Sequence, residues 1–208
     1  MASELLLSPR FLAPVSYYAA MCRYDKVAID CSAPFNKREK ELHRTVIADA
    51  NGTATITVPI SKPQSMSRAT WKDILVSDHN HWWNEMTTAL RSAYGRTPFF
   101  EFYFDDFAPL LSARTAGKTL LGLNTALDTL LRRLLLIETP VEYIYDRKDL
   151  PAGDTDDFRH RDIDFISDVD YYQLRASRHG FQPGLSIVDL LFNMGPEAAV
   201  VLRQMSDR

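Results

Sequence analysis

Residues 43–58 read HRTVIADANGTATITV, two runs of strand-forming residues that flank Asn51-Gly52. Asn-Gly readily adopts the positive φ angles of a type I′ turn, so this stretch predicts a β-hairpin over residues 43–60. In the second run apolar residues alternate with threonines, which predicts one buried and one exposed face. We therefore expect Ile47, Ile56 and Val58 to be buried.

Helical patterns dominate the sequence after this hairpin. Apolar residues recur at helical spacing in residues 82–94, and leucines do so in residues 120–137, where Leu127 lies on the stripe expected to be buried. Thr97-Pro98 is typical of a helix start. Further strands are expected at residues 27–30, 72–76 and 141–145, and short helices at 171–178 and 186–193. The pattern predicts an α+β fold in which an antiparallel hairpin or sheet in the N-terminal third packs against a mainly helical remainder.

The length and composition indicate one ordinary globular domain. The chain has 208 residues, 46% of them hydrophobic, which is enough to bury a full core, and we expect a single domain over residues 1–208. Residues 147–168 are acidic and poor in apolar side chains, so this stretch is a candidate mobile loop. The formal net charge is −3, which argues against electrostatic capture of nucleic acid.

The first residues do not fit a signal peptide, and the cysteines are few, so we expect a cytoplasmic protein. The first ten residues carry Glu4 where a signal peptide would be positively charged, and their apolar run is short. Charged and amide residues interrupt the apolar stretch 120–137, so no membrane span is expected. Cys22 and Cys31 are too few for a disulfide framework and are expected to be buried free thiols.

Two histidines, His79 and His81, form a His-x-His pair that could act in acid–base chemistry. On an extended strand such a pair could chelate a metal, but the pair lies where a strand is expected to give way to a helix. There the histidines are more simply exposed residues at a helix start, and spacing fixes no third ligand. No metal site is therefore assigned, and the sequence identifies no cofactor.

Arginines and acids supply the other candidate groups. Arg44, from the hairpin, and Arg91, from the helix at 82–94, could each hold a phosphate or carboxylate, although a lone arginine is usually a surface ion-pair partner. Asp105-Asp106 follows an aromatic run, which suits a carbohydrate pocket or, more simply, the solvated end of a buried helix.

Five segments together resemble one family, the WbqC-like proteins of bacteria, which are often encoded among genes for O-antigen and other surface polysaccharides. The matching segments are residues 8–18 (SPRFLAPVSYY), 43–45, 51–52 with 56–60, 92–103 (SAYGRTPFFEFY) and 180–198 (GFQPGLSIVDLLFNMGPEA), together with Trp82. The resemblance covers nearly the whole chain. Relatives often carry Asn where this chain has Thr45, and His where it has Met86. If either group is catalytic in those relatives, this chain is inactive or differently specific.

The resemblance implies an enzyme of surface-polysaccharide precursor metabolism that transfers a group to an amino sugar or sugar nucleotide. A non-catalytic binding or assembly protein of the same pathway is the alternative, so enzymatic activity stays open, as does oligomerisation. The expected catalytic residues are His79, His81 and Glu101. The expected substrate-binding residues are Tyr17, Arg44, Tyr94, Asn193 and Glu197. Because polar groups on apolar elements are rare unless they meet in a cavity, we expect Tyr17, Arg44, Tyr94 and Glu101 to line one pocket, with Asn193 or Glu197 at its rim. The alternative is that Arg44 and Glu101 form a structural ion pair and that Asn193 caps a helix junction.

Overall fold

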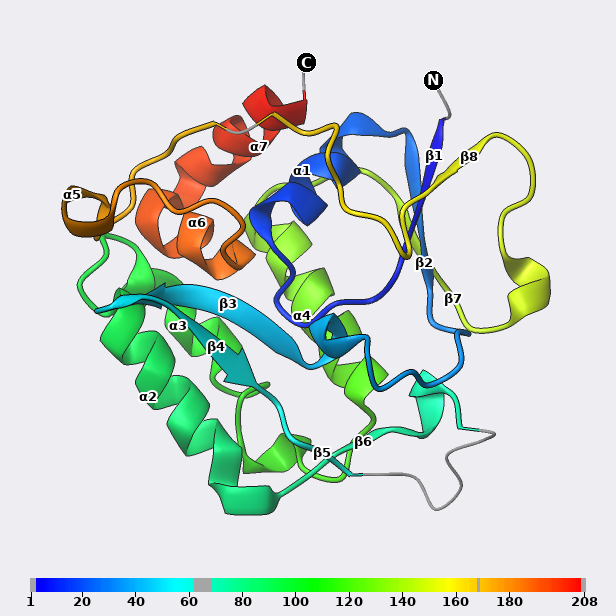
Figure 1. Ribbon diagram of the computed structural model, residues 1–208, viewed down its shortest axis with the longest axis horizontal. Coiled ribbons are helices and arrows are strands. Elements are labelled where there is room, and N and C mark those ends of the chain that lie inside the picture. Colours follow the sequence, from blue (N-terminus) through cyan, green and yellow to red (C-terminus); the bar gives the residue numbers. More distant parts are fainter. Residues whose placement is uncertain (1–2, 62–68, 168, 207–208) are drawn as a thin grey trace.

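Four parallel strands form the main sheet. The computed structural model describes residues 3–61, 69–167 and 169–206. The sheet contains β1 (Glu4–Leu7), β2 (Lys26–Asp30), β7 (Val141–Ile144) and β8 (Thr155–Asp157), in the order β7-β2-β1-β8 (Figure 1). Each adjacent pair runs parallel. The expectation of an antiparallel main sheet in the N-terminal third is therefore wrong, and the fold is a mixed one.

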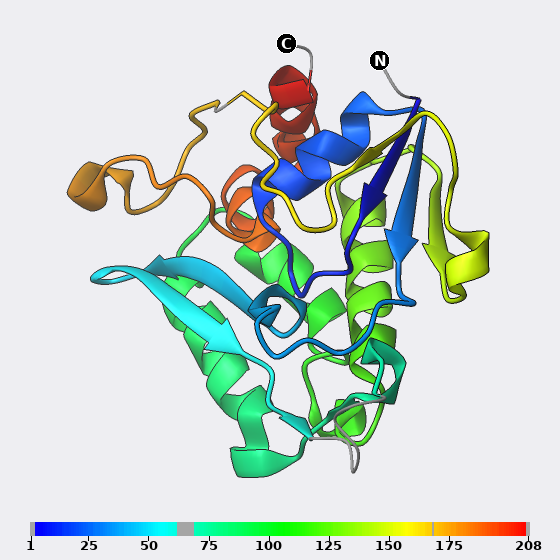
Figure 2. The same cartoon turned by 45° about the vertical axis from the view of Figure 1, so that its right-hand side comes forward.

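The physical reason for the parallel sheet lies in the unbroken apolar runs of its central strands. Leu5, Leu6 and Leu7 are all buried, as are the central residues of β2, so both faces of the sheet are covered. Figure 2 shows α1 (Val15–Arg23) and α4 (Leu120–Leu134) together on one face. On the other face, Leu6 packs with Ala28 and Ile144, and Leu150 covers them.

The remaining elements have the following bounds. The other α-helices are α2 (Trp82–Tyr94), α3 (Phe100–Phe107), α5 (Ala176–His179), α6 (Ile187–Met194) and α7 (Ala198–Ser206). The 3₁₀ helices are η1 (Lys40–Leu42), η2 (Trp71–Asp73), η3 (His79–His81), η4 (Ala113–Thr115), η5 (Arg147–Asp149) and η6 (Gly195–Glu197). A short antiparallel pair joins β5 (Ile60–Ser61) to β6 (Leu75–Val76). None of the described helices has the length and apolar character needed to cross a bilayer.

The predicted hairpin is confirmed as a separate two-stranded sheet. Strand β3 (Arg44–Asp49) pairs antiparallel with β4 (Gly52–Thr57), and Asp49 lies opposite Gly52. The turn differs from the predicted type I′ turn at Asn51-Gly52. Its two central residues are Ala50 and Asn51, neither of which has a positive φ, and Gly52, with φ of 120°, is the first residue of β4. Ile47, Ile56 and Val58 are buried as expected. The alternation of apolar and polar residues thus identified the hairpin but not the main sheet.

The order of the strands creates a switch point at the carboxyl end of the sheet. From β1 the chain proceeds outward to β2 and then to β7, and it returns to the far side of β1 as β8. Ligands of open parallel sheets bind outside the carboxyl ends of the strands near such a reversal. Residues that directly follow β1 and β8, and the last residues of β2, are therefore the first place to search for a site.

The start of α3 and the acidic stretch 147–168 were both predicted from the sequence. The helix predicted to begin at Thr97-Pro98 instead begins at Phe100, because the hydroxyl of Thr97 bonds back to the carbonyl of Tyr94 and Phe99 occupies the N-cap. The stretch 147–168 contains η5 and β8, although residue 168 lies outside the described residues. The mobility of this stretch stays a prediction.

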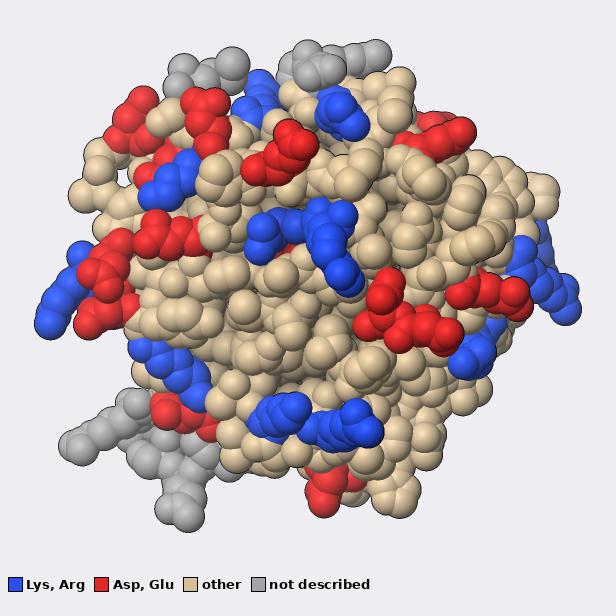
Figure 3. Space-filling view, turned by 180° about the vertical axis from the view of Figure 1, so that it is seen from behind, with Lys and Arg blue, Asp and Glu red and all other residues tan. Residues whose placement is uncertain are grey.

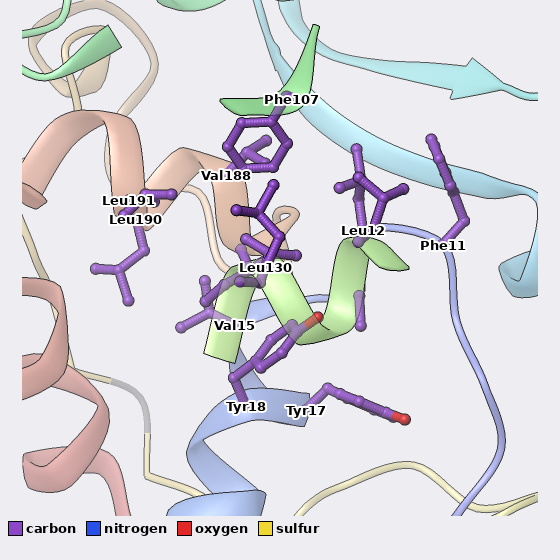
Figure 4. Packing of buried hydrophobic residues seen from close by; sticks show 14 of the residues in the cluster. Phe11, Leu12, Val15, Tyr17, Tyr18, Phe107, Leu130, Val188, Leu190 and Leu191 are labelled. Carbon is purple, nitrogen blue, oxygen red and sulfur yellow. The ribbon is translucent and has the colours of Figure 1, made fainter. Parts of the chain in front are cut away.

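The main core lies between the sheet and the C-terminal helices. Figure 4 shows Val188 from α6 beside Phe107, with Leu130 from α4 and Tyr18 from α1 in the same cluster. Leu127 belongs to the same cluster and is 1% exposed, as its helical stripe predicted. In Figure 4 the hydroxyl of Tyr17 is directed away from these apolar side chains.

Candidate functional site

A small polar pocket lies at the carboxyl ends of β1, β2 and β7. We call it the sheet-end pocket. Its lining residues are Pro9, Arg10, Tyr17, Ile29, Asn124, Thr125, Asp128 and Tyr143. Its free volume of about 10 Å³ is close to the space of one water molecule. The pocket can therefore admit one small polar group, with the rest of a larger molecule outside.

Two acceptor oxygens in the sheet-end pocket lack partners. Asn124 and Asp128 lie one turn apart on α4, and they are only 2% and 6% exposed. The side chain of Asn124 donates from Nδ2 to the carbonyl of Leu42 at 2.8 Å, which leaves its Oδ1 as an acceptor. Among the residues that the structure describes, neither Asn124 Oδ1 nor Asp128 Oδ1 has a hydrogen-bond partner. A buried acceptor without a donor is costly, so these oxygens indicate a binding site for a donor group.

The other oxygen of Asp128 is fully engaged. Asp128 Oδ2 accepts a hydrogen bond from Arg132 Nε at 2.8 Å and another from the hydroxyl of Tyr143. Burial and the charge of Asp128 raise the pKa of Tyr143 to about 12, so its hydroxyl stays protonated at neutral pH and donates. These contacts hold the carboxylate in one orientation. The buried hydroxyl of Tyr18 also lies close to Asp128, and burial together with this carboxylate raises the pKa of Tyr18 well above its usual value.

Tyr17 and Arg10 also line the pocket. The hydroxyl of Tyr17 donates to the carbonyl of Ser8 at 2.9 Å, and burial together with the charge of Asp128 raises its pKa well above the usual value. The guanidinium of Arg10 lies 5.7 Å from the centre of the Tyr17 ring and is half-buried. A cation at the mouth and a carboxylate inside give the pocket two distinct polar ends.

An ionic network fixes the same edge of the sheet. Arg159, just after β8, contacts Asp30 Oδ2 at the end of β2 and Asp157 Oδ2 at the end of β8, each at 2.7 Å. Asp30 Oδ1 also accepts hydrogen bonds from the backbone and the hydroxyl of Ser32. The hydroxyl of Ser8 donates to the carbonyl of Arg159 at 3.0 Å. The network joins three strand ends and so holds the neighbourhood of the pocket rigid.

The substrate-binding residues predicted from the sequence do not share one pocket. Tyr17 lines the sheet-end pocket, whereas Tyr94 and Asn193 line another small cavity with Gln173 and Asp189. In that cavity burial raises the pKa of Asp189 to about 6, although hydrogen bonds from Tyr171 and its other neighbours oppose the rise. Tyr171, Gln173 and Asn193 donate there to Asp189, which indicates a structural network, whereas Arg175 Nε at the edge of this cavity has no partner among the described residues.

The other predicted residues lie at the surface. Arg44, Glu101 and Glu197 are exposed, on β3, α3 and η6 respectively. His79 and His81 are exposed at the start of α2, where Asn80 and His81 have φ of 55° and 48°. In the described part of the chain no group of three or more His, Cys, Asp or Glu residues could hold a metal ion.

Arg10, Asn124, Asp128 and Tyr143 were missed as site residues. A signal for two of them existed, because Asn124 and Asp128 are four residues apart on the leucine-rich face of α4. Polar residues on a buried helical face need partners, and such a pair indicates a cavity. Nothing local marks Tyr143, which reaches the pocket only through the pairing of β7 with β2.

The fold and this pocket define a protein with an open parallel sheet and a polar pocket at the carboxyl ends of its strands. The model of the WbqC-like protein family matches residues 8–152 and 151–201. The chain belongs to the WbqC-like protein family. No curated protein and no solved structure matches it.

Proposed function

We propose that this chain is an enzyme of bacterial surface-polysaccharide precursor metabolism that acts on the amine of an amino sugar. One observation carries the proposal: two buried acceptor oxygens without partners, Asn124 Oδ1 and Asp128 Oδ1, line a pocket at the carboxyl end of a parallel sheet. Two acceptors, one of them on a carboxylate, suit a cationic donor group better than a neutral one. The pathway assignment is part of the proposal and rests on the gene context that the family resemblance implies.

The size of the pocket supports recognition of a single terminal group. A volume of about 10 Å³ accommodates an ammonium group but not a sugar ring, so the ring would stay at the mouth. There the guanidinium of Arg10 is placed to bind a phosphate or carboxylate on the same molecule. An amino sugar with an anionic substituent therefore fits both ends of the pocket.

The chemistry expected of the pocket is removal of a proton from the bound amine. Asp128 Oδ1 would accept one proton from the bound ammonium group, which leaves a neutral carboxylic acid and a neutral amine with a lone pair. Arg132 and Tyr143 would hold the carboxylate in place throughout, through their bonds to Oδ2. Asp128 is the catalytic residue of this proposal, and Arg132 and Tyr143 are positioning residues.

The alternative of a binding or assembly protein would need a broad apolar surface. The exposed large apolar side chains of the described residues come instead from seven separate segments. They are Val46, Leu75, Phe102, Leu136, Tyr145, Tyr172 and Val200.

A ligand titration with a matched control variant tests the proposal. Glucosamine 6-phosphate should raise the melting temperature more than glucose 6-phosphate at equal concentration, because only the first carries an ammonium group. Asp128→Asn should weaken glucosamine 6-phosphate binding by about tenfold to a hundredfold, the value of one charge-assisted hydrogen bond. Asp30→Asn is the control, since Asp30 is also a buried acid paired with an arginine but lies outside the pocket.

Two results would contradict the proposal. One is equal stabilisation by the amino sugar and the hydroxyl sugar. The other is equal loss of binding in Asp128→Asn and Asp30→Asn, with both variants folded by circular dichroism. That second result would mean that Asp128 acts only through the stability of the sheet.

A further inference from the structure

A second, larger cavity lies between the end of α2 and the segment around α5. It has a volume of about 620 Å³, within the range of small-molecule sites. We call it the arginine groove, because four arginines line it: Arg91, Arg96, Arg175 and Arg178. Ser92 and Ser177 add hydroxyl groups, and no acidic residue lines it. Figures 1 and 2 place α5 at the opposite end of the molecule from the main sheet.

The four arginines lack the acidic partners that surface arginines usually have. In the described residues, none of them has a carboxylate within 4.0 Å, whereas Arg132 and Arg159 do. Four guanidinium groups that converge on one groove repel one another unless an anion lies among them. The arrangement therefore indicates an anionic ligand.

Two of the guanidinium groups are held in place. Arg175 donates from Nη2 to the carbonyl of Ser92 at 3.0 Å, while its Nε is buried and, among described residues, without a partner. The guanidinium of Arg91 lies 4.4 Å from the centre of the Phe104 ring. Arg175 lines the small cavity around Asp189 as well as the groove. Prepositioned guanidinium groups also lose little entropy on binding.

The buried network around Asp189 supports the position of Arg175. The backbone N–H of Leu174 donates to Asn193 Oδ1 at 3.0 Å, and the side chain of Gln173 donates to Asp189 Oδ2 at 3.0 Å. These bonds anchor the two residues that precede Arg175 to α6. Asp189 and Asn193, on the buried side of α6, do not line the groove, but they hold the segment that carries Arg175.

We propose that the arginine groove binds the diphosphate group of a small ligand. Each guanidinium can offer two parallel N–H donors to phosphate oxygens, and four of them match the charge and the oxygen count of a diphosphate better than those of a single phosphate. Nucleic acid fits less well, since the net charge is −3 and the face in Figure 3 intersperses Lys and Arg with Asp and Glu. This proposal does not rest on the amine site, because the two cavities share no residue.

Isothermal titration with inorganic pyrophosphate at low ionic strength tests this site. Wild type should bind pyrophosphate, and the double variant Arg96→Glu/Arg178→Glu should bind at least about tenfold more weakly, because both charges in the groove are reversed. Both residues are exposed, so the variant should fold. The control is Arg114→Glu/Arg133→Glu, which makes the same change in net charge at two exposed arginines elsewhere and should stay within about twofold of wild type.

The remaining outcomes decide the ligand class. Orthophosphate should bind more weakly than pyrophosphate, since it spans fewer guanidinium groups, and Asp128→Asn should bind pyrophosphate as wild type does. No heat with pyrophosphate, equal affinity for orthophosphate, or equal losses in the two double variants would overturn the proposal. Tighter binding of a single-stranded oligonucleotide than of pyrophosphate would also overturn it, in favour of a nucleic-acid surface.

Discussion

Replacing Arg159 with methionine should destabilise the protein by about 3 kcal/mol, because it leaves a carboxylate buried without its cation. The side chain of Asp30 is 3% exposed and would keep only its hydrogen bonds from Ser32. Breaking a buried pair typically costs about 3–5 kcal/mol, whereas Asp157, whose side chain is 45% exposed, should add less than about 1 kcal/mol. The expected loss of stability lies near the lower end of this range because the side chain of Arg159 itself is 22% exposed.

Urea denaturation measures this loss against a matched control. With a slope of about 2 kcal/mol per molar urea, the midpoint should fall by about 1.5 M. The control is Lys26→Met, which removes an exposed cation that contacts Glu4 and Glu142 at the other end of the same sheet. Its cost should stay under about 1 kcal/mol. If Arg159→Met loses no more stability than Lys26→Met, the network does not hold the strand ends together.

The pH dependence of the stability difference between wild type and Arg159→Met provides a second check of the network. Burial alone would raise the pKa of Asp30, but the hydrogen bonds from Ser32 and Arg159 outweigh it and lower the pKa. The hydrogen bonds from Arg159 likewise lower the pKa of Asp157. A carboxyl with a lowered folded pKa stabilises the protein above its unfolded pKa of about 4, and this contribution is lost as the pH falls. The stability gap between wild type and Arg159→Met should therefore narrow below about pH 4; a gap that widens there would contradict the network.

Three further predictions concern the core, the thiols and the acidic segment. Leu127→Ala should cost about 2–5 kcal/mol in chemical denaturation, since Leu127 is 1% exposed; a loss under about 0.5 kcal/mol would remove it from the core. Burial raises the pKa of Cys22 to about 11 and of Cys31 to about 12, so neither thiol should react with Ellman's reagent at pH 7 until the protein unfolds, and rapid labelling of the native protein would contradict this. Residues 147–168 should exchange amide hydrogens rapidly in the free protein except in β8, which pairs with β1, and strong protection on both sides of β8 would argue against a mobile loop.

Local patterns in the sequence predicted the elements better than their assembly. The hairpin, α2, α4, β2 and β7 each follow from periodicity or turn residues within a short window. Strand β8 reads Thr155-Asp156-Asp157, which has low strand propensity, and it exists because it pairs with the apolar β1. The parallel sheet brings together segments that no short window contains, so its existence could not be read from any one of them.

The residues of the candidate site also divide into those that local sequence patterns can identify and those whose role depends on the assembled fold. Tyr17 was identified through its family segment, and it lines the sheet-end pocket. Arg91, considered as an anion-binding residue, lines the arginine groove. Asn124 and Asp128 could have been recognised as polar residues on an apolar helical face. Arg175 could not, because its role depends on the bonds that anchor the segment before it to α6.

The order of the strands along the chain has a consequence for synthesis on the ribosome. The neighbouring strands β1 and β2 emerge early, but their outer partners β7 and β8 follow only after residues 31–140. Until Ile144 and Leu150 are synthesised, the face formed by Leu6 and Ala28 has no cover. Contacts of such long sequence separation form slowly and leave apolar surface open in the meantime. The apolar face of β1 and β2 thus stays exposed for most of chain elongation. Chaperones that bind extended apolar segments would bind the nascent chain there.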